Sequence, residues 1–377
     1  FSCSYCLSSI DKCLRFREIE LVKKELQFFI DKKVPQVKFV DRTFNCRHDH
    51  AMAIWTYIHE HDNGITNFHF EVSADLLNEK EIALINRMRP GLIQLEIGVQ
   101  SANEITIREI NRTMKIDVLS TIVDKIKKGN NVHQHLDLIA GLPYEGYESF
   151  GKSFDRVYKM NPEQLQLGFL KVLKGSVMHD RAQEYGIVYQ DRAPYEVLST
   201  KWLTYAEVIR LKQIEEMVEV YYNSGQFCCT MAALEQEFAS PFCMYECLAA
   251  YYDEKNAFAV SHSRIGRYEI LYDFIVKTCK ERSEQYMEML TLDMYLRDNV
   301  KKRPEFLRES GVSSDEAAAF YKKEEKERTY LKAYEGYDRR QMRKMTHLER
   351  IDGKTVLFDY KNRDPLTGNA AIYYLSE

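Results

Sequence analysis

The sequence predicts an α/β protein in which a partial TIM-like barrel of parallel strands is followed by a mainly helical α+β domain. Two observations support this prediction. Between residues 15 and 175, short β-branched and aromatic runs alternate with stretches in which apolar residues recur at helical spacing. After about residue 180 this alternation stops, and long amphipathic or highly charged stretches follow. We therefore expect two domains, residues 1–180 and residues 181–377.

The first domain is expected to consist of repeated strand–helix units. Helices are expected near residues 19–30, 52–59, 79–88, 118–128 and 149–158. Strands are expected at residues 37–40, 68–72, 92–99, 133–139 and 165–170. Strands separated by helices of this length are typical of a parallel sheet, and a right-handed run of such units closes wholly or partly into a barrel.

The second domain is expected to be mostly helical, with two strands near its end. A long amphipathic helix is predicted over residues 205–222, where Asn223-Ser224-Gly225 stops it. Residues 339–350 form the most basic segment, and we interpret them as a solvated helical face in preference to an RNA site. Residues 355–360 and 371–375 are expected to be strands around a turn at residues 365–369.

Composition and charge exclude some functional classes. The chain has 377 residues, 45% of them apolar, and a formal net charge of −4, so bulk electrostatics do not favour nucleic acid or an anionic membrane. No apolar run reaches the roughly 18 residues that span a bilayer. The nine cysteines are unevenly spaced and odd in number, which fits thiols or metal thiolates in a reducing compartment better than a disulfide framework. We therefore expect a cytoplasmic protein without a membrane partner.

The chemistry-bearing feature is at the start of the chain. Cys3 and Cys6 are separated by two residues, so both thiolates can reach one metal centre from a single loop. On spacing alone, the pair is compatible with a redox dithiol, half of a zinc site or ligands of an iron–sulfur cluster. Cys13 is poorly spaced for a third ligand, which we expect upstream of Phe1.

The segment Cys3-Ser4-Tyr5-Cys6, followed by a βα barrel, resembles the end of the radical S-adenosylmethionine (radical SAM) signature, Cys-x-x-x-Cys-x-aromatic-Cys. The resemblance implies that Cys3 and Cys6 are two of three ligands of a [4Fe–4S] cluster and that Tyr5 fills the aromatic position. The first cysteine would then lie four residues before Cys3. The chain would be truncated at its N-terminus, as a partial (β/α)6 barrel without its first strand.

Other segments of the first domain are similar to this superfamily in order and spacing. They are residues 37–45, 70–77, 95–101 and 135–143, which resemble the second to fifth strands with their loops, and Asn111-Arg112. The resemblance implies that S-adenosylmethionine (SAM) is bound by Tyr5, Asp41, Glu71, Glu96, Gln100, Ser101, Arg112, Gly141 and Pro143. Asp137 lies in the middle of its strand and is expected only to orient a loop.

Simpler interpretations exist for several of these residues. Glu71 and Glu96 are also compatible with solvated strand ends, and Arg112 with a surface helix. Gln100 and Ser101 are also compatible with capping the next helix, for which Ser101 or Asn103 would serve as N-cap. Four cysteines of the second domain suggest a second cluster, but burial in an aromatic core is favoured for them. These cysteines are Cys228, Cys229, Cys243 and Cys247.

The second domain resembles the C-terminal domain of uncharacterised radical SAM proteins that carry an N-terminal cobalamin-binding domain. Residues 210–219 and 358–369 carry this resemblance. It implies a radical SAM enzyme that reductively cleaves SAM to a 5′-deoxyadenosyl radical, with cobalamin as a candidate cofactor through a missing upstream domain. A small-molecule substrate and a reductant such as flavodoxin or ferredoxin are the expected partners.

Three alternative functions remain open from the sequence. The fifth-strand segment also resembles oxygen-independent coproporphyrinogen oxidases, which act on tetrapyrroles. An RNA-modifying methyltransferase or methylthiotransferase would use the basic segment at residues 339–350. The non-enzymatic alternative is a metal-stabilised interaction module.

Overall fold

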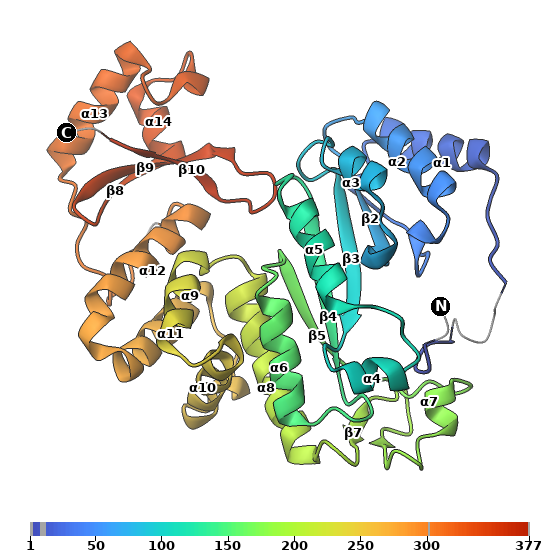
Figure 1. Ribbon diagram of the computed structural model, residues 1–377. Helices are drawn as coiled ribbons and strands as arrows, with labels where there is room; N and C mark the ends of the chain where they lie inside the picture. The colour runs from blue at the N-terminus through green and yellow to red at the C-terminus, as the bar shows by residue number, and fades with distance from the viewer. Residues whose placement is uncertain (1–2, 8–12, 301, 376–377) are drawn as a thin grey trace. The chain divides into compact units, whose positions relative to one another are not determined.

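The computed structural model describes residues 3–7, 13–300 and 302–375 of the chain. The chain divides into two compact units (Figure 1). Unit 1 comprises residues 1–219 and 240–246, and unit 2 comprises residues 220–239 and 247–377. Each unit has its own sheet and its own core. The domain boundary expected after residue 180 stays a prediction.

Unit 1 is built on a curled half-barrel of five parallel strands (Figure 1), which confirms the predicted partial TIM-like fold. Its strands follow one another in the order β1-β2-β3-β4-β5. They are β1 (Gln36–Lys38), β2 (Asn67–Val72), β3 (Ile93–Gln100), β4 (His133–Ala140) and β5 (Gln164–Phe169). In the register of the sheet, Glu71 is level with Glu96, and Glu96 is level with His135. This register brings chemically active side chains of three strands to one height.

Helices cover the sheet of unit 1. They are α1 (Ile19–Asp31), α2 (His48–Glu60), α3 (Glu79–Ile85), α4 (Glu104–Glu109), α5 (Ile116–Lys127) and α6 (Tyr147–Tyr158). Successive side chains of a strand point to opposite faces of the sheet. Phe70 on β2 is fully buried against Phe44 and Trp55, whereas its neighbours His69 and Glu71 are on the opposite face of the strand. The buried face is an aromatic and aliphatic core, and the opposite face is polar.

Unit 1 continues with short elements and one long helix. These are α7 (Val177–Asp180), β6 (Val188–Tyr189), β7 (Val197–Ser199) and α8 (Tyr205–Val218). Thr204 and Glu207 form a capping box at the start of α8, which explains why the helix begins there. The predicted helix over residues 205–222 is regular only to Val218, and a π-helical turn covers Glu219–Asn223.

Unit 2 combines helices with a three-stranded antiparallel sheet. The helices are α9 (Cys228–Leu234), α11 (Arg264–Thr278), α12 (Ser283–Arg297), α13 (Ser314–Glu327) and α14 (Arg339–Met345), and the division between the units falls within α10 (Pro241–Glu254). The sheet has the order β10-β9-β8, with β8 (Thr346–Ile351), β9 (Lys354–Arg363) and β10 (Ala370–Tyr374). The α+β prediction for this part of the chain is confirmed.

The prediction of a solvated helical face over residues 339–350 is wrong in its second half. Helix α14 ends at Met345, and β8 begins at Thr346. Glu349 of this strand is fully buried, and Arg303 Nη1 lies 2.5 Å from its Oε2. The strand was not predicted because charged residues usually indicate an exposed segment. Here the charge of Glu349 is buried in an ion pair with Arg303.

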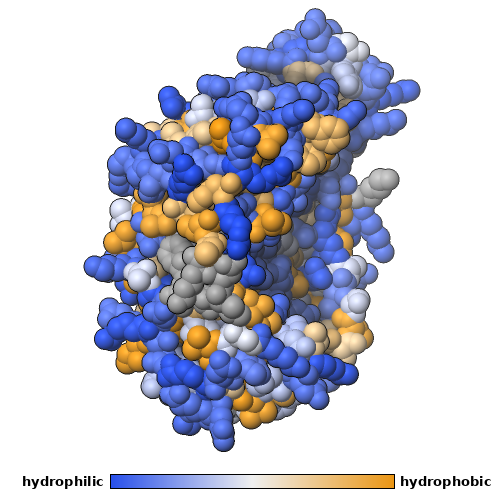
Figure 2. Space-filling model, turned by 90° about the vertical axis from the view of Figure 1, so that its right-hand side faces the viewer, coloured by the Kyte–Doolittle hydropathy of each residue, from blue (hydrophilic) through white to orange (hydrophobic). Residues whose placement is uncertain are grey.

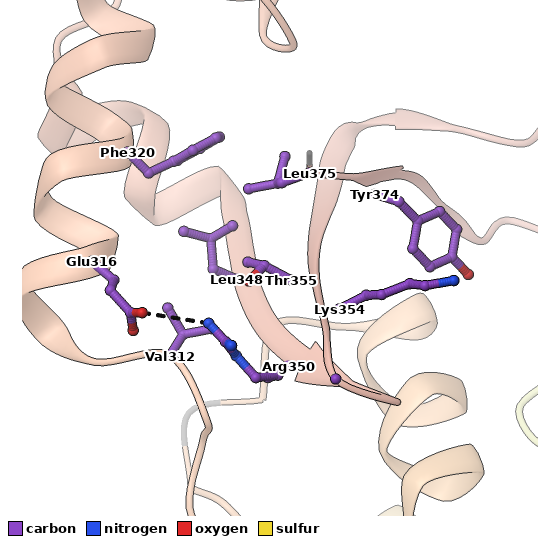
Figure 3. Close-up of a pocket in the computed structure, with 10 residues that line it drawn as sticks. Val312, Glu316, Phe320, Leu348, Arg350, Lys354, Thr355, Tyr374 and Leu375 are labelled. Carbon is purple, nitrogen blue, oxygen red and sulfur yellow. Dashed lines mark hydrogen bonds and ion pairs between the residues drawn. The ribbon is translucent and has the colours of Figure 1, made fainter. Parts of the chain in front are cut away.

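Unit 2 contains a cavity of about 940 Å³ beside α13 and the sheet (Figure 3). Phe320, Leu348 and Leu375 form its apolar part. Arg350 Nη2 and Glu316 Oε1 lie 3.4 Å apart and form an ion pair at its edge. Neither this cavity nor its residues were predicted from the sequence.

The surface that Figure 2 shows is mainly hydrophilic, with hydrophobic residues in small groups. Within the described ranges, none of the helices combines the length and the apolar character that a membrane span needs.

Candidate cofactor site at the ends of the barrel strands

The cysteine segment is fixed at the end of the half-barrel by backbone hydrogen bonds. Ser4 N donates to Ile110 O at 3.0 Å, after α4, and Met178 N of α7 donates to Ser4 O at 2.8 Å. Cys6 N donates to Cys3 O at 3.1 Å and closes a turn. This turn places the two cysteines of the Cys-x-x-Cys pair beside the carboxyl ends of the strands, where barrel enzymes build their sites.

A pocket of about 420 Å³ lies beside this segment. Its lining comes from the cysteine segment, from the ends of β1 to β4 and from the residues that follow β1 and α4. Seven of the residues predicted from the sequence line it: Cys3, Tyr5, Cys6, Glu71, Glu96, Gln100 and Arg112. The whole lining of the pocket therefore comes from six separate parts of the chain.

Two arginines stand next to the two sulfur atoms. Arg42 Nη1 lies 2.9 Å from Cys6 Sγ, and Arg112 Nη1 lies 3.9 Å from Cys3 Sγ. Arg112 also donates to the backbone oxygen of Gly98, which fixes its guanidinium group in the pocket. Sequence reasoning did not assign a role to Arg42, although its position just after a barrel strand was a usable signal.

The carboxylates of β2 and β3 have different environments. Glu96 Oε2 lies 2.9 Å from His69 Nε2 and 3.2 Å from Lys38 Nζ. The hydrogen bonds from His69 and Lys38 lower the pKa of Glu96 to about 2. Burial and the neighbouring charge of Glu96 instead raise the pKa of Glu71, whose Oε1 lies 3.9 Å from Lys38 Nζ. Glu96 is thus ionised at neutral pH, and Glu71 is the more readily protonated of the two.

A histidine–carboxylate pair on β4 lies next to these groups. His135 Nε2 is 3.1 Å from Asp137 Oδ1, and Asp137 lines the pocket. Burial alone would lower the pKa of His135, but the hydrogen bond and the charge of Asp137 raise it above its ordinary value. Burial raises the pKa of Asp137 itself. Asp137 therefore faces the pocket, whereas the sequence predicted only a role in orienting a loop.

Gln100 and Ser101, which are adjacent in sequence, have different roles. Gln100 has a left-handed backbone conformation, with φ of 73°, and lines the pocket. Ser101 is fully buried outside the pocket lining, and its hydroxyl group donates to Glu145. Asn103 caps α4 by accepting from Ile105 N and Thr106 N. The capping alternative is thus correct for Asn103 and not for Ser101.

Three other predicted residues do not line the pocket. Asp41 lines a separate cavity of about 380 Å³ between β1, α1 and α2. Gly141 packs against Val197, and the backbone oxygen of Pro143 accepts from the Thr106 hydroxyl group. A sequence motif places such residues near a strand end, but only packing decides which of them reach the pocket.

The residues present fit part of the ligand set that an iron–sulfur cluster needs. The pair Cys3 and Cys6 offers two sulfur ligands beside two cations, which suits a negatively charged thiolate set. In the part of the chain that the structure describes, no group of three or more histidines, cysteines or carboxylates could hold a metal ion. The third cysteine stays an expectation of the sequence.

The four cysteines of the second domain are less buried than expected: Cys228 is exposed, and Cys229, Cys243 and Cys247 are half-buried. Partial desolvation and the charge of Asp293 raise the pKa of the Cys228 and Cys229 thiols, which keeps them protonated. The Asp293 carboxylate accepts from Cys229 N at 2.9 Å and from Thr230 N at 2.8 Å, so it caps α9. None of the nine cysteines is in a disulfide.

Two family models match consecutive parts of the chain. Residues 1–157 match the family model described as "Radical SAM superfamily", and residues 183–365 match "Protein of unknown function (DUF4080)". Oxygen-independent coproporphyrinogen III oxidase of Salmonella typhimurium is 29% identical over 107 residues. That match covers 27% of this chain and only 23% of the relative, so the two share about a quarter of their lengths.

Two solved structures show a distant likeness. The radical SAM methyltransferase TsrM of Kitasatospora setae is 15% identical, with a TM-score of 0.44. The match covers 52% of this chain and 36% of the TsrM chain. The cobalamin-dependent SAM radical enzyme OxsB is 12% identical, covers 78% of this chain and 52% of its own, and has a TM-score of 0.46. On the two family models, the first part of this chain belongs to the radical SAM superfamily and is followed by a domain of the DUF4080 family.

Proposed function

We propose that this protein is a radical SAM enzyme that holds a [4Fe–4S] cluster through Cys3 and Cys6 and binds SAM in the adjoining pocket. One observation carries the proposal: two cysteine sulfurs, two guanidinium groups and three carboxylates line a single pocket at the ends of parallel strands. When bound, the cluster and SAM supply the chemistry, which is reductive cleavage of SAM to methionine and a 5′-deoxyadenosyl radical.

The pocket residues divide into groups with distinct tasks. The guanidinium group of Arg112, fixed by its bond to Gly98 O, suits the carboxylate of SAM. Glu71 and the amide of Gln100 offer acceptors for hydroxyl or amino groups. Lys38 and His69 hold Glu96 in place, and the ammonium group of Lys38 offsets its charge. The buried Cys3 sulfur and the half-buried ring of Tyr5, whose pKa burial raises, exclude water from the cysteine turn.

The wider activity is a further part of this proposal. The protein would act on a small-molecule substrate and receive electrons from a flavodoxin or ferredoxin. Cobalamin is the candidate second cofactor, supported by the resemblance of residues 210–219 and 358–369 to proteins that carry a cobalamin-binding domain.

The proposal is tested by SAM cleavage. The full-length protein is reconstituted anaerobically with iron and sulfide, reduced with dithionite and supplied with SAM, and 5′-deoxyadenosine is measured by mass spectrometry. We expect product from the unaltered protein and at least a hundredfold less from the double variant C3S/C6S, because the cluster would lose two ligands.

The exposed Cys13 provides the matched control. Cys13→Ser removes a nearby thiol outside the pocket and should leave cleavage unchanged. A reduced, intact cluster that binds SAM and yields no 5′-deoxyadenosine would contradict the proposal. An equal loss of product in the Cys13 variant would mean that Cys3 and Cys6 are not the distinguishing cluster ligands, and it would contradict the ligand assignment.

A further inference from the structure

Glu145 is a buried carboxylate that lies outside the cofactor pocket and connects two loops of the half-barrel. It is in the connection between β4 and α6, and it is 1% exposed. Its Oε1 accepts from the Ser101 hydroxyl group at 2.7 Å and from the Ser153 hydroxyl group at 2.7 Å. Its Oε2 is buried without a hydrogen-bond partner among the described residues. Nothing in the sequence motifs or in the cofactor site accounts for this arrangement.

The two serines extend the contact of Glu145 to the backbone of the β3–α4 loop. Ser101 Oγ accepts from Asn103 N at 2.9 Å, and Ser153 Oγ accepts from Ala102 N at 3.0 Å. Each serine hydroxyl group therefore donates to Glu145 and accepts from a loop amide. Because the carboxylate accepts both serine hydrogen bonds, the lone pairs of the serine oxygens remain available to the two amides. One acceptor group thus orients the whole loop.

Further bonds join the same two loops. The Asn103 side-chain amide donates to Tyr144 O at 3.1 Å and to Ser149 Oγ at 2.9 Å, and the Thr106 hydroxyl group donates to Pro143 O at 3.0 Å. The β3–α4 loop thus depends on the β4–α6 loop for its position, with Glu145 at the centre of the contact.

The β3–α4 loop in turn determines two pocket residues. It begins directly after Gln100, which has a φ of 73° and a buried Oε1 without a partner among the described residues. A side chain at Gly98 would clash with the Gln100 amide, so Gln100 lies against Gly98. Arg112, which follows α4, donates to Gly98 O. Displacement of the loop would move both an acceptor and a cation in the pocket.

We propose that Glu145 is a positioning residue for the cofactor pocket: its ionised carboxylate holds the β3–α4 loop, and thereby Gln100 and Arg112, in the geometry that binds SAM. This inference rests on the proposed function for the identity of the ligand. Glu145 itself touches neither the pocket nor the cysteines, so it acts only through the loop.

The surroundings of Glu145 make its charge state variable near neutral pH. The groups that face it are the neutral serines of the loop and of α6. The charged residues on the same elements, Glu104, Glu148 and Lys152, form no ion pair with it in the described part of the chain. Burial raises the pKa of Glu145 to about 7, against the two serine hydrogen bonds, which lower it. The carboxylate therefore gains its negative charge, and its full strength as an acceptor, as the pH rises through 7.

The test measures SAM affinity as a function of pH. Binding of SAM to the reconstituted full-length protein is measured by calorimetry between pH 6 and pH 8.5, with the unaltered protein and the variant Glu145→Gln. We expect the affinity of the unaltered protein to rise about tenfold across pH 7, the size of one charge-assisted hydrogen bond. The variant should keep the low affinity throughout, because its amide carries no charge.

Glu163→Gln is the matched control. Glu163 is also partly buried, pairs with Lys127 at 2.6 Å and accepts from Gln134 N at 2.8 Å, outside the pocket lining. Its variant should retain the pH-dependent rise. The same rise in the Glu145 variant would overturn the positioning role.

A second measurement does not require SAM or the cluster. Hydrogen exchange of the Ala102 and Asn103 amides, corrected for the intrinsic effect of pH, should slow across pH 7 in the unaltered protein and not in the Glu145 variant. A protein that binds no SAM overturns the proposed function, and exchange then decides the role of Glu145 alone. Unchanged exchange together with normal SAM binding overturns only the role of Glu145.

Discussion

Arg42 and Arg112 come from distant segments of the chain and stand beside the two sulfurs of one turn. Of these residues, the sequence predicted the cysteines and Arg112, because each belongs to a segment that resembles the radical SAM superfamily. It did not predict Lys38, His69 or Arg42. The roles of Lys38 and His69 depend on the alignment of β1, β2 and β3, which places them beside Glu96. Such alignment is a property of the sheet and not of any local pattern.

Asp293 gives a prediction at the scale of one residue. Burial raises its pKa to about 6, while the amides of Thr230 and Cys229 act in the opposite direction. Because its pKa in the folded state exceeds the ordinary value of 3.8, the folded protein favours the protonated form. The contribution of Asp293 to stability is therefore most favourable below pH 3.8 and decreases as the pH rises to about 6.

The expected size of this decrease is about 3 kcal/mol, at 1.36 kcal/mol for each unit of pKa. Denaturant unfolding of the unaltered protein and of Asp293→Asn at pH 4, 5, 6 and 7 measures it. The free-energy difference between the two proteins should shift in favour of the variant as the pH rises. A difference that stays constant over this range would contradict the assignment.

At the scale of the element, the sequence was most informative where a pattern was long. Five strands and their helices were predicted because buried apolar residues recur along them, as in β3, where Ile93, Leu95, Ile97 and Val99 are fully buried. Helix α4 was anticipated only through the capping alternative at Ser101 or Asn103, because its six residues carry too short a pattern. Strand β8 was missed because its charged residues, Glu349 among them, are paired inside the fold.

Gly141 provides an element-scale prediction, since the end of β4 depends on it. Its φ is 90°, and a Cβ atom there would lie 2.8 Å from Val197 Cγ1 of β7. Gly141→Ala therefore combines backbone strain with a steric clash and should reduce the free energy of unfolding by about 3 kcal/mol. Thermal unfolding followed by circular dichroism measures the loss.

Gly64 is the control for the steric part of this loss. It also has a positive φ, of 73°, but a Cβ atom there would meet nothing within 4 Å. Gly64→Ala should reduce the free energy of unfolding by about 1 kcal/mol, the contribution of backbone strain alone. Equal destabilisation by the two substitutions would show that the Val197 contact does not matter. Val197→Ala combined with Gly141→Ala should restore part of the stability.

At the scale of the whole molecule, the boundary between the two compact units differs from the boundary between the two family matches. Residues 183–219 belong to unit 1 by their contacts, yet they match the start of the family of unknown function. Helix α8, which lies in this range, therefore belongs to the compact unit of the barrel. A functional study of the second domain should keep the chain intact, because separation near residue 180 would remove α8 from unit 1.

The charge of the whole molecule gives the last prediction, which concerns the RNA alternative. The chain has 53 basic and 57 acidic residues, so no long-range field attracts a polyanion. The basic residues Arg339, Arg340 and Arg343 are exposed on α14, a helix of only seven residues. A short basic helix on a protein with a negative net charge would make too few phosphate contacts for binding at physiological salt.

We expect no binding of a 30-nucleotide single-stranded RNA at 150 mM salt by fluorescence anisotropy, and no change when the three arginines are replaced by glutamine. Binding that weakens with salt and is lost in the triple variant would instead support an RNA-modifying enzyme.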